Sequence, residues 1–328
     1  MKSIFFFTAL FISLIAAAQQ HAYKIVKTYH IASPGGWDYL AVHNGMIYVS
    51  HASQVNILNE QTGDSAGIIP NTNGVHGIAF DNALNRGYTS NGRTNNITVF
   101  DLATNAVIQQ VGTGENPDAI LFEPYTGMII TCNGRSKNLS VIDPKTNQVL
   151  ATIDVGGKPE TAVSNGAGKL FVNIEDRNEI AVIDLKQHKV QTRWPLGGAE
   201  GPTGLAFDPK SKRLFAGCDK WLVVVNAEDG NVVTKLPIGK GCDGVAFDGR
   251  RATIYTSNGE GSMTVIKEVS PQKFTVEGNY PTKPGARTIT MNEKTGTVYM
   301  PTADFDAQTT ADTRRKMIPG TFQVLVIK

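Results

Sequence analysis

Seven polar residues recur about 41 residues apart, each at the start of an apolar run in an internal repeat of the chain. They are Asp38, His76, Asp118, Glu160, Thr203, Asp243 and Arg287, called the ring residues below. If the fold brings them together, four carboxylates and one guanidinium sum to a charge of −3. Crowded carboxylates repel one another, so such a ring should bind a cation, pair with Arg287 or hold raised pKa values.

These residue types suggest a metal site and a proton-transfer site. Asp118, Glu160 and Asp243 are the candidate metal ligands, because carboxylate oxygens suit a divalent cation such as Ca²⁺, Mg²⁺, Mn²⁺ or Zn²⁺. His76 and Arg287 are the candidate catalytic residues, with His76 moving a proton. The alternative is that the ring residues only bond to the backbone of neighbouring repeats and to channel water. The mixture of types favours a site, since scaffold positions should repeat more uniformly.

The elements that must position these residues are short strands. Each repeat holds four β-branched or aromatic runs of five to seven residues, separated by clusters of Asn, Asp, Gly and Pro. Seven such repeats predict an all-β, seven-bladed β-propeller with four antiparallel strands per blade. The last repeat has only three strands, and the segment from Tyr23 to His30 is expected to supply its fourth, so that the N-terminal strand closes the ring.

Four segments carry a resemblance to a known repeat. They are Tyr48-Val-Ser-His51, Tyr88-Thr-Ser-Asn91, Phe171-Val-Asn173 and Tyr255-Thr-Ser-Asn258, each followed by a Val-Ile-Asp type strand. The chain resembles the YVTN repeat propellers of YncE-like proteins over residues 21–328. The resemblance implies the propeller fold. It does not choose a chemistry, because the family includes periplasmic and cell-surface binding proteins and related propellers include metal-dependent lyases.

A second set of candidates is expected around the ring. In a propeller, the loops that lead into the innermost strands and the loops between the second and third strands open on one face, called the top face here. The predicted ligand-binding residues on it are Asp38, His51, Asn91, Arg93, Asn133, Arg135, Glu175, Arg177 and Asn258. The two Asn-Gly-Arg segments at 91–93 and 133–135 read as turns, which leaves their arginines to reach solvent or an anionic ligand group.

Recurring aspartates read instead as scaffold, because they stand at one position in most repeats and precede tight turns. A carboxylate there can accept backbone N–H groups of the turn. The set comprises Asp81, Asp208 and Asp248 after the first strand of a repeat, and Asp101, Asp143 and Asp184 after the third.

The seventh repeat carries an insertion of about 20 residues, from Pro301 to Gly320, where other repeats have short turns. Phe305 and Met317 give this segment apolar groups to bury. A cover over the ring and a surface loop are the two interpretations that its position allows.

Three cysteines leave at least one thiol unpaired, because disulfides use cysteines in twos. Cys132 lies in an apolar run and is expected to be buried. Cys218 and Cys242 are expected in adjacent blades on the top face, where a disulfide and two separate thiols are both open.

The N-terminal segment is typical of an export signal. Lys2 precedes an apolar stretch from Ile4 to Ala18 that ends in small residues, with Ala16 and Ala18 at the cleavage positions. We expect residues 1–18 to be removed, leaving residues 19–328 as a single periplasmic or secreted β-propeller domain. The stretch is too short to span a bilayer, and no later segment is apolar enough to do so.

Composition excludes some functions. The 328 residues carry a net charge of +2 with no basic run, which argues against nucleic acid and anionic membranes as partners. The first functional hypothesis is a binding propeller that presents its top face to a small molecule, glycan, peptide or envelope protein. The alternative is a divalent-metal-dependent lyase or hydrolase with its site at the mouth of the central channel.

Overall fold

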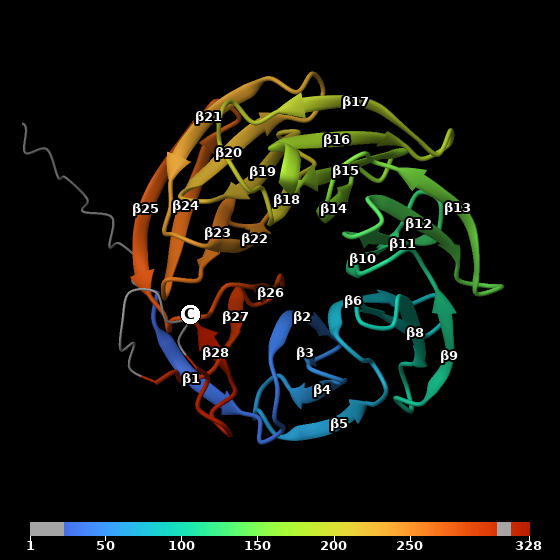
Figure 1. The fold of residues 1–328 in the computed structure, drawn as a ribbon. Coiled ribbons are helices and arrows are strands. Elements are labelled where there is room, and N and C mark those ends of the chain that lie inside the picture. Colours follow the sequence, from blue (N-terminus) through green and yellow to red (C-terminus); the bar gives the residue numbers. More distant parts are fainter. Residues whose placement is uncertain (1–22, 307–315) are drawn as a thin grey trace, which may run out of the picture.

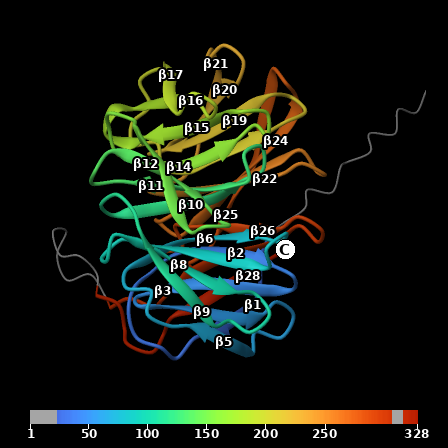
Figure 2. The same cartoon turned by 90° about the vertical axis from the view of Figure 1, so that its right-hand side faces the viewer.

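Seven four-stranded antiparallel sheets stand around a central axis in the computed structural model of the chain, which describes residues 23–306 and 316–328 (Figure 1). Each sheet is one blade, and its strands follow one another from the axis outward. Seen from the side, the strands run mainly along the axis, so that strand ends and their loops gather on two opposite faces (Figure 2). The predicted all-β, seven-bladed propeller is confirmed.

The strand bounds are given blade by blade, starting from the innermost strand. Blade 1 contains β2 (Trp37–His43), β3 (Met46–His51), β4 (Gln54–Asn59) and β5 (Ser65–Ile69); blade 2 contains β6 (Val75–Asp81), β7 (Arg86–Asn91), β8 (Asn96–Asp101) and β9 (Val107–Gly112); blade 3 contains β10 (Pro117–Glu123), β11 (Met128–Asn133), β12 (Asn138–Asp143) and β13 (Gln148–Asp154). Blade 4 contains β14 (Pro159–Ser164), β15 (Lys169–Ile174), the 3₁₀ turn η1 (Glu175–Arg177), β16 (Glu179–Asp184) and β17 (Lys189–Pro195). Blade 5 contains β18 (Leu205–Asp208), β19 (Arg213–Cys218), β20 (Trp221–Asn226) and β21 (Val232–Pro237); blade 6 contains β22 (Cys242–Asp248), β23 (Thr253–Asn258), β24 (Ser262–Ser270) and β25 (Lys273–Pro281). Blade 7 contains β26 (Thr290–Asn292), β27 (Thr297–Thr302), β28 (Gln323–Ile327) and β1 (Ile25–His30).

The two ends of the chain close the ring, as predicted. β1 pairs antiparallel with β28, with Tyr29 opposite Val324 and Ile25 opposite Ile327. Backbone bonds from Lys24 N to Lys328 O and from Ile31 N to Phe322 O, each 2.9 Å long, extend the pairing at both ends. The C-terminal strand therefore gains a hydrogen-bonded neighbour on each side.

The hydrophobic core lies between the blades. In the second and third strands almost every residue is buried, as in β7 and β8, because both faces of the sheet pack on neighbouring blades. The outer strands are mostly exposed, as in β9. Burial on both faces explains the continuous apolar runs of the middle strands, which alternate less than a strand with one wet face.

Turn carboxylates hold the ends of the strands on the face opposite the top face, as the repeated aspartates predict. Oδ1 of Asp81 accepts the N–H groups of Ala83 and Leu84, and Asp101 binds the turn after β8 in the same way. In blade 3 this position is taken by Glu123, which is buried and also accepts a 2.6 Å bond from the Ser164 hydroxyl of blade 4.

Charge in the closing strand should unfold the protein. Val324 of β28 is fully buried, whereas Val26 of β1 is 40% exposed, so the same substitution can be compared at both. We expect Val324→Asp to lower the free energy of unfolding by more than about 4 kcal/mol, because it buries an unpaired charge. Val26→Asp should cost about 1 kcal/mol or less. Urea unfolding measures both, and equal losses would contradict closure by β28.

The Glu123 carboxylate should stabilise the fold in a pH-dependent way. Burial alone would raise the pKa of Glu123, but bonds from Ser164, Thr126 and Tyr125 outweigh it and lower that pKa. A carboxyl with a lowered folded-state pKa stabilises above its unfolded pKa and loses this contribution as the pH falls through the folded value.

We therefore expect Glu123→Gln to cost about 1.5 to 3 kcal/mol at pH 7 and less below pH 4.5. Glu293→Gln, in the corresponding exposed turn of blade 7, is the control. Denaturant titrations at pH 7 and pH 3.5 measure the difference. A cost that does not depend on pH would assign the effect to packing.

Candidate functional site at the channel mouth

All seven ring residues line one cavity of about 290 Å³ at the top face, around the axis of the propeller. Five of them lie in the innermost strands, whereas Thr203 and Arg287 lie in the loops that lead into β18 and β26, and these strands surround the axis (Figure 1). Tyr39, Lys158 and Glu175 complete the lining. The seven positions that the repeat singled out therefore line one cavity.

Hydrogen bonds between blades fix the backbone of the ring. The Ser90 hydroxyl of blade 2 donates to the carbonyl of Asp118 in blade 3 and accepts a 2.8 Å bond from Gly77 N. Four further junctions use the same kind of bond: Asn173 to the Thr203 carbonyl, Thr203 to Cys242, Ser257 to Arg287, and Thr288 to Asp38. The side chains of the ring are thus held at fixed distances around the channel.

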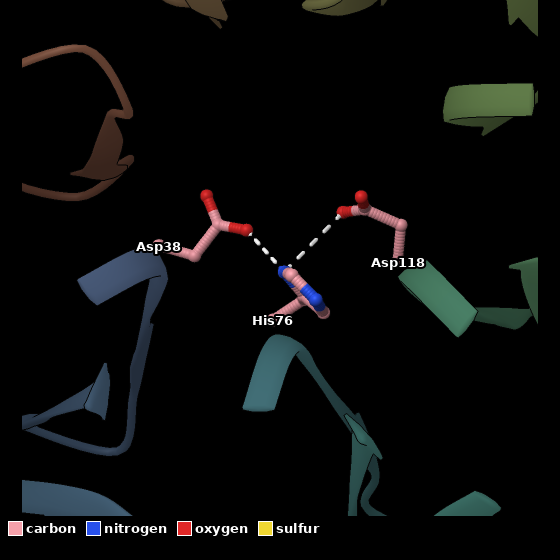
Figure 3. A group of neighbouring side chains, drawn as sticks. All are labelled: Asp38, His76 and Asp118. Carbon is pink, nitrogen blue, oxygen red and sulfur yellow. Dashed lines mark hydrogen bonds and ion pairs between the residues drawn. The ribbon is translucent and has the colours of Figure 1, made fainter. Parts of the chain in front are cut away.

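His76 lies between two aspartates from the neighbouring blades (Figure 3). Its Nδ1 atom is 2.5 Å from Oδ2 of Asp38 and 3.9 Å from Oδ1 of Asp118. Burial lowers the pKa of His76, but the hydrogen bond to Asp38 and the charges of both aspartates outweigh burial and raise it above its usual value. The imidazole is therefore held ready to carry a positive charge.

Among the ring carboxylates, the negative charge of Asp118 has the weakest contact with a cationic partner, which is His76 at 3.9 Å. Burial, followed by the charge of Asp38, raises the pKa of Asp118 to about 7. Its side chain is 14% exposed, and its Oδ1 atom is buried without a hydrogen-bond partner among the described residues. Buried polar atoms are normally bonded, so this oxygen is a free acceptor inside the cavity.

Glu160 and Asp243 are each paired with a cation. Lys158 Nζ lies 2.6 Å from Oε1 of Glu160 and also contacts Glu175. Burial and the charge of Asp118 raise the pKa of Glu160, while Lys158 opposes this shift. Arg287 lies 3.3 Å from Asp243 and 3.4 Å from Oδ1 of Asp38, and burial raises the pKa of Asp243 to about 6 against the pull of this guanidinium.

The candidate metal ligands are therefore distributed differently from the predicted set. Among the residues that the structure describes, the group that brings three ligand atoms within 4.8 Å of one another consists of Asp38, His76 and Asp118. Of the predicted ligands Asp118, Glu160 and Asp243, only Asp118 belongs to it. The carboxylates of the other two, Glu160 and Asp243, pair with Lys158 and Arg287 instead. The sequence alone did not show which carboxylates have cationic partners.

Three of the predicted ligand-binding residues serve the scaffold. Asn91, Asn133 and Asn258 are fully buried. Each accepts a hydroxyl bond from the threonine two residues before it and donates to a hydroxyl on the next strand, as Asn91 does with Thr89 and Thr98. The amides that could face a ligand are thus used inside the blades, which explains why this residue recurs at the end of the second strand.

His51 is also buried, away from the open cavity. Its ring bonds to the Ser33 hydroxyl at 2.7 Å and to the Gly35 carbonyl at 2.9 Å, and it stacks on Phe322. Burial lowers the pKa of His51 despite its hydrogen bonds, which favours the neutral imidazole. It therefore holds the loop before β2 to blade 7.

The predicted arginines Arg93, Arg135 and Arg177 are exposed on successive blades of the top face. Exposed carboxylates such as Glu115 and Asp176 lie on loops of the same face, so the rim carries charges of both signs, while the centre of the face is acidic. Of the remaining predicted residues, Asp38 and Glu175 line the cavity itself.

Two lining residues were missed by the sequence analysis, although the repeat contains their signal. Lys158 stands two residues before its ring residue, where five other blades have Gly and blade 3 has Asn116. Tyr39 follows its ring residue, where the other blades have only Gly, Ala or Thr. Burial and the surrounding carboxylates raise the pKa of Tyr39 well above its usual value, so its phenol stays protonated.

The cysteines are three free, buried thiols. Cys218 ends β19 and Cys242 begins β22 in adjacent blades, as expected, but no bond joins them. Burial raises the pKa of the Cys218 thiol to about 12, which makes it a poor nucleophile.

The described ends of the blade 7 insertion converge on the loop beside Asp38. Phe305 and Met317 form an isolated bridge, and the Phe305 ring lies 6.1 Å from that of Trp37. Lys283 pairs with Asp304 at 2.7 Å. Residues 307–315 lie outside the described residues, and the cover over the ring stays a prediction.

The fold and the site define a seven-bladed β-propeller with a polar, acidic funnel at one end of its channel. Hydrazine synthase from Kuenenia stuttgartiensis is similar in structure, with a TM-score of 0.72 over 83% of this chain and 94% of that chain at 14% identity. A likeness at this identity supports the fold alone. No family model and no curated protein matches the sequence. Within residues 23–306 and 316–328, no helix is long and apolar enough to cross a membrane.

Neutralising Asp118 should stabilise the protein at neutral pH. Because its folded-state pKa of about 7 lies above the ordinary 3.8, the wild type loses stability as the pH rises from 3.8 to 7. Asp118→Asn lacks this loss and should melt about 2 °C or more higher at pH 7.5, with no difference at pH 4. Calorimetry at the two pH values, with exposed Glu115→Gln as control, measures it. A lower melting temperature at pH 7.5 would mean that the charge stabilises the ring.

Proposed function

We propose that this chain is an exported binding propeller of the YVTN/YncE-like type, whose funnel receives a small cationic ligand. The supporting observation is the charge of the cavity, which is lined by Asp38, Asp118, Glu160, Glu175 and Asp243 against Lys158 and Arg287. Five carboxylates and two permanent cations give a formal charge of −3 when every carboxylate is ionised and His76 is neutral. A cleft with one sign of charge attracts and concentrates the opposite sign.

The size of the funnel fits this proposal. A cavity of about 290 Å³ lies at the lower end of the range for small-molecule sites, which favours a compact ligand over a large one. Oδ1 of Asp118 offers an unused acceptor within it. Peptide, glycan or envelope-protein partners would have to contact the exposed arginines around the rim, namely Arg93, Arg135 and Arg177.

A divalent-metal-dependent lyase or hydrolase is the second candidate function. It is favoured by Asp38, His76 and Asp118, which could hold an ion beside a protonatable imidazole. In such an enzyme His76 and Arg287 would face the substrate from the two sides of Asp38. The hydroxyl of the ring residue Thr203 donates to the Cys242 carbonyl, so a threonine nucleophile is less well supported.

Cation binding is tested by titration calorimetry with putrescine, a compact diammonium probe, at low and at high salt. We expect binding at low salt that weakens as salt screens the funnel. The double variant Asp118→Asn/Asp243→Asn should weaken it by more than tenfold, or about 1.4 kcal/mol.

Glu293→Gln removes one carboxylate from the opposite face and is the control, so its affinity should equal that of the wild type. Absence of putrescine binding to the wild type would overturn the proposal of an organic-cation site, as would equal affinity of the double variant.

A further inference from the structure

We infer that Asp38, His76 and Asp118 form a binding site for a divalent transition-metal ion of the Zn²⁺ type. The three residues come from the innermost strands of blades 1, 2 and 3, and each offers one ligand atom directed toward the others (Figure 3). The inference deepens the proposed function, because it names one cation that the funnel holds and the residues that hold it.

The three ligand atoms lie within 4.8 Å of one another, so one ion could contact all three after a modest movement of the side chains. Two ligand atoms at about 2.1 Å from one tetrahedral ion lie roughly 3.4 Å apart. Nδ1 of His76 lies 2.5 Å from Asp38 and 3.9 Å from Asp118, one shorter and one longer than this value. To hold an ion, the imidazole would lose the proton it shares with Asp38, and its Nδ1 atom would move roughly 0.9 Å away from Asp38 and roughly 0.5 Å closer to Asp118.

An unused buried acceptor points to the same place. Oδ1 of Asp118 is the oxygen that faces His76, and it is buried without a hydrogen-bond partner among the described residues. An isolated buried carboxylate oxygen is costly unless a donor or an ion reaches it. Elsewhere in the ring the protein itself supplies a cation to the carboxylate: Lys158 pairs with Glu160, and Arg287 pairs with Asp243.

The surroundings would orient the ligands. Asp38 uses Oδ2 toward His76 while its Oδ1 faces Arg287 at 3.4 Å, so the guanidinium can hold the carboxylate without occupying the ligand oxygen. The carbonyls of Asp38 and Asp118 accept hydroxyl bonds from Thr288 and Ser90. Both aspartate backbones are therefore fixed before any ion arrives.

The ligand types select the metal. Imidazole suits Zn²⁺ and other transition ions, whereas Ca²⁺ and Mg²⁺ prefer oxygen ligands only. Three protein ligands leave a fourth position open toward the cavity, as in zinc sites that bind a water or a small ligand. Of the divalent ions considered from the sequence, Zn²⁺ therefore fits best and Ca²⁺ fits least.

The test is titration calorimetry of the metal-free protein, prepared without a histidine tag, with Zn²⁺ and separately with Ca²⁺. We expect one Zn²⁺ per chain and much weaker Ca²⁺ binding. His76→Ala and Asp118→Asn should each weaken Zn²⁺ binding by more than about tenfold. Glu160→Gln removes a buried ring carboxylate that already has Lys158 as partner, so it should weaken Zn²⁺ binding less than Asp118→Asn does. Glu293→Gln, on the opposite face, is the control, and its Zn²⁺ affinity should equal that of the wild type.

A second readout separates ligation from folding. The visible spectrum of the Co²⁺-loaded protein should show the d–d bands of tetrahedral coordination, which His76→Ala should lose, while the far-UV circular dichroism of both proteins stays the same. Absence of stoichiometric Zn²⁺ binding would overturn the site, and so would a loss in Glu160→Gln as large as that in Asp118→Asn. Putrescine binding without Zn²⁺ binding would overturn only the metal site, whereas Zn²⁺ binding without putrescine binding would restrict the funnel to metal ions.

Discussion

The hydrogen bond from a side chain of one blade to the backbone carbonyl of a ring residue in the next blade is the interaction on which the site depends. Ser90 is the clearest example of this bond. Its hydroxyl accepts a hydrogen bond from Gly77 N, beside His76, and donates one to the carbonyl of Asp118 in the next blade. The bond satisfies polar groups that the start of an innermost strand would otherwise leave unpaired next to the channel. It also sets the spacing of neighbouring ring residues, and among these residues the side chain of Thr203 makes such a bond itself, to the Cys242 carbonyl.

Fixed spacing has an electrostatic consequence. Seven residues held around a narrow channel cannot separate to relieve repulsion, so the charges themselves must be compensated. Lys158 and Arg287 do this for Glu160 and Asp243, and raised pKa values absorb part of the remainder at Asp118 and Asp243. The two cations stand at positions that break the repeat pattern, Lys158 in place of Gly or Asn and Arg287 in place of an acid or a neutral residue.

Sequence reasoning predicted the fold well because the repeat supplies its own control. The aspartates that recur at the position of Asp81 predicted tight turns after the first strand of their repeats. The seventh repeat lacks a fourth strand, which predicted that β1 completes the last blade. The ring residues were found by the same reasoning, as departures at one repeated position. The partners of the ring carboxylates could not be predicted from the repeat. Whether Glu160 faces Lys158 or an ion depends on the direction of its side chain, which the spacing of residues along the chain does not determine. Asn91 was misassigned for a related reason: a polar residue at a strand end suggests a ligand contact, yet its partners Thr89 and Thr98 lie within the blade.

The compensation is uneven around the ring, and this asymmetry decides where a cation would be most stable. On the side of blades 4, 6 and 7, each carboxylate already contacts Lys158 or Arg287, so an incoming cation would have to displace a permanent charge. On the side of blades 1 to 3, Asp38 and Asp118 share only a titratable imidazole and the outer contact of Arg287. A proton on His76 and a metal ion are alternative ways to neutralise that side. Because a metal ion brings two charges to two carboxylates and can also reach the unpartnered oxygen of Asp118, it completes the neutralisation that the imidazolium leaves unfinished.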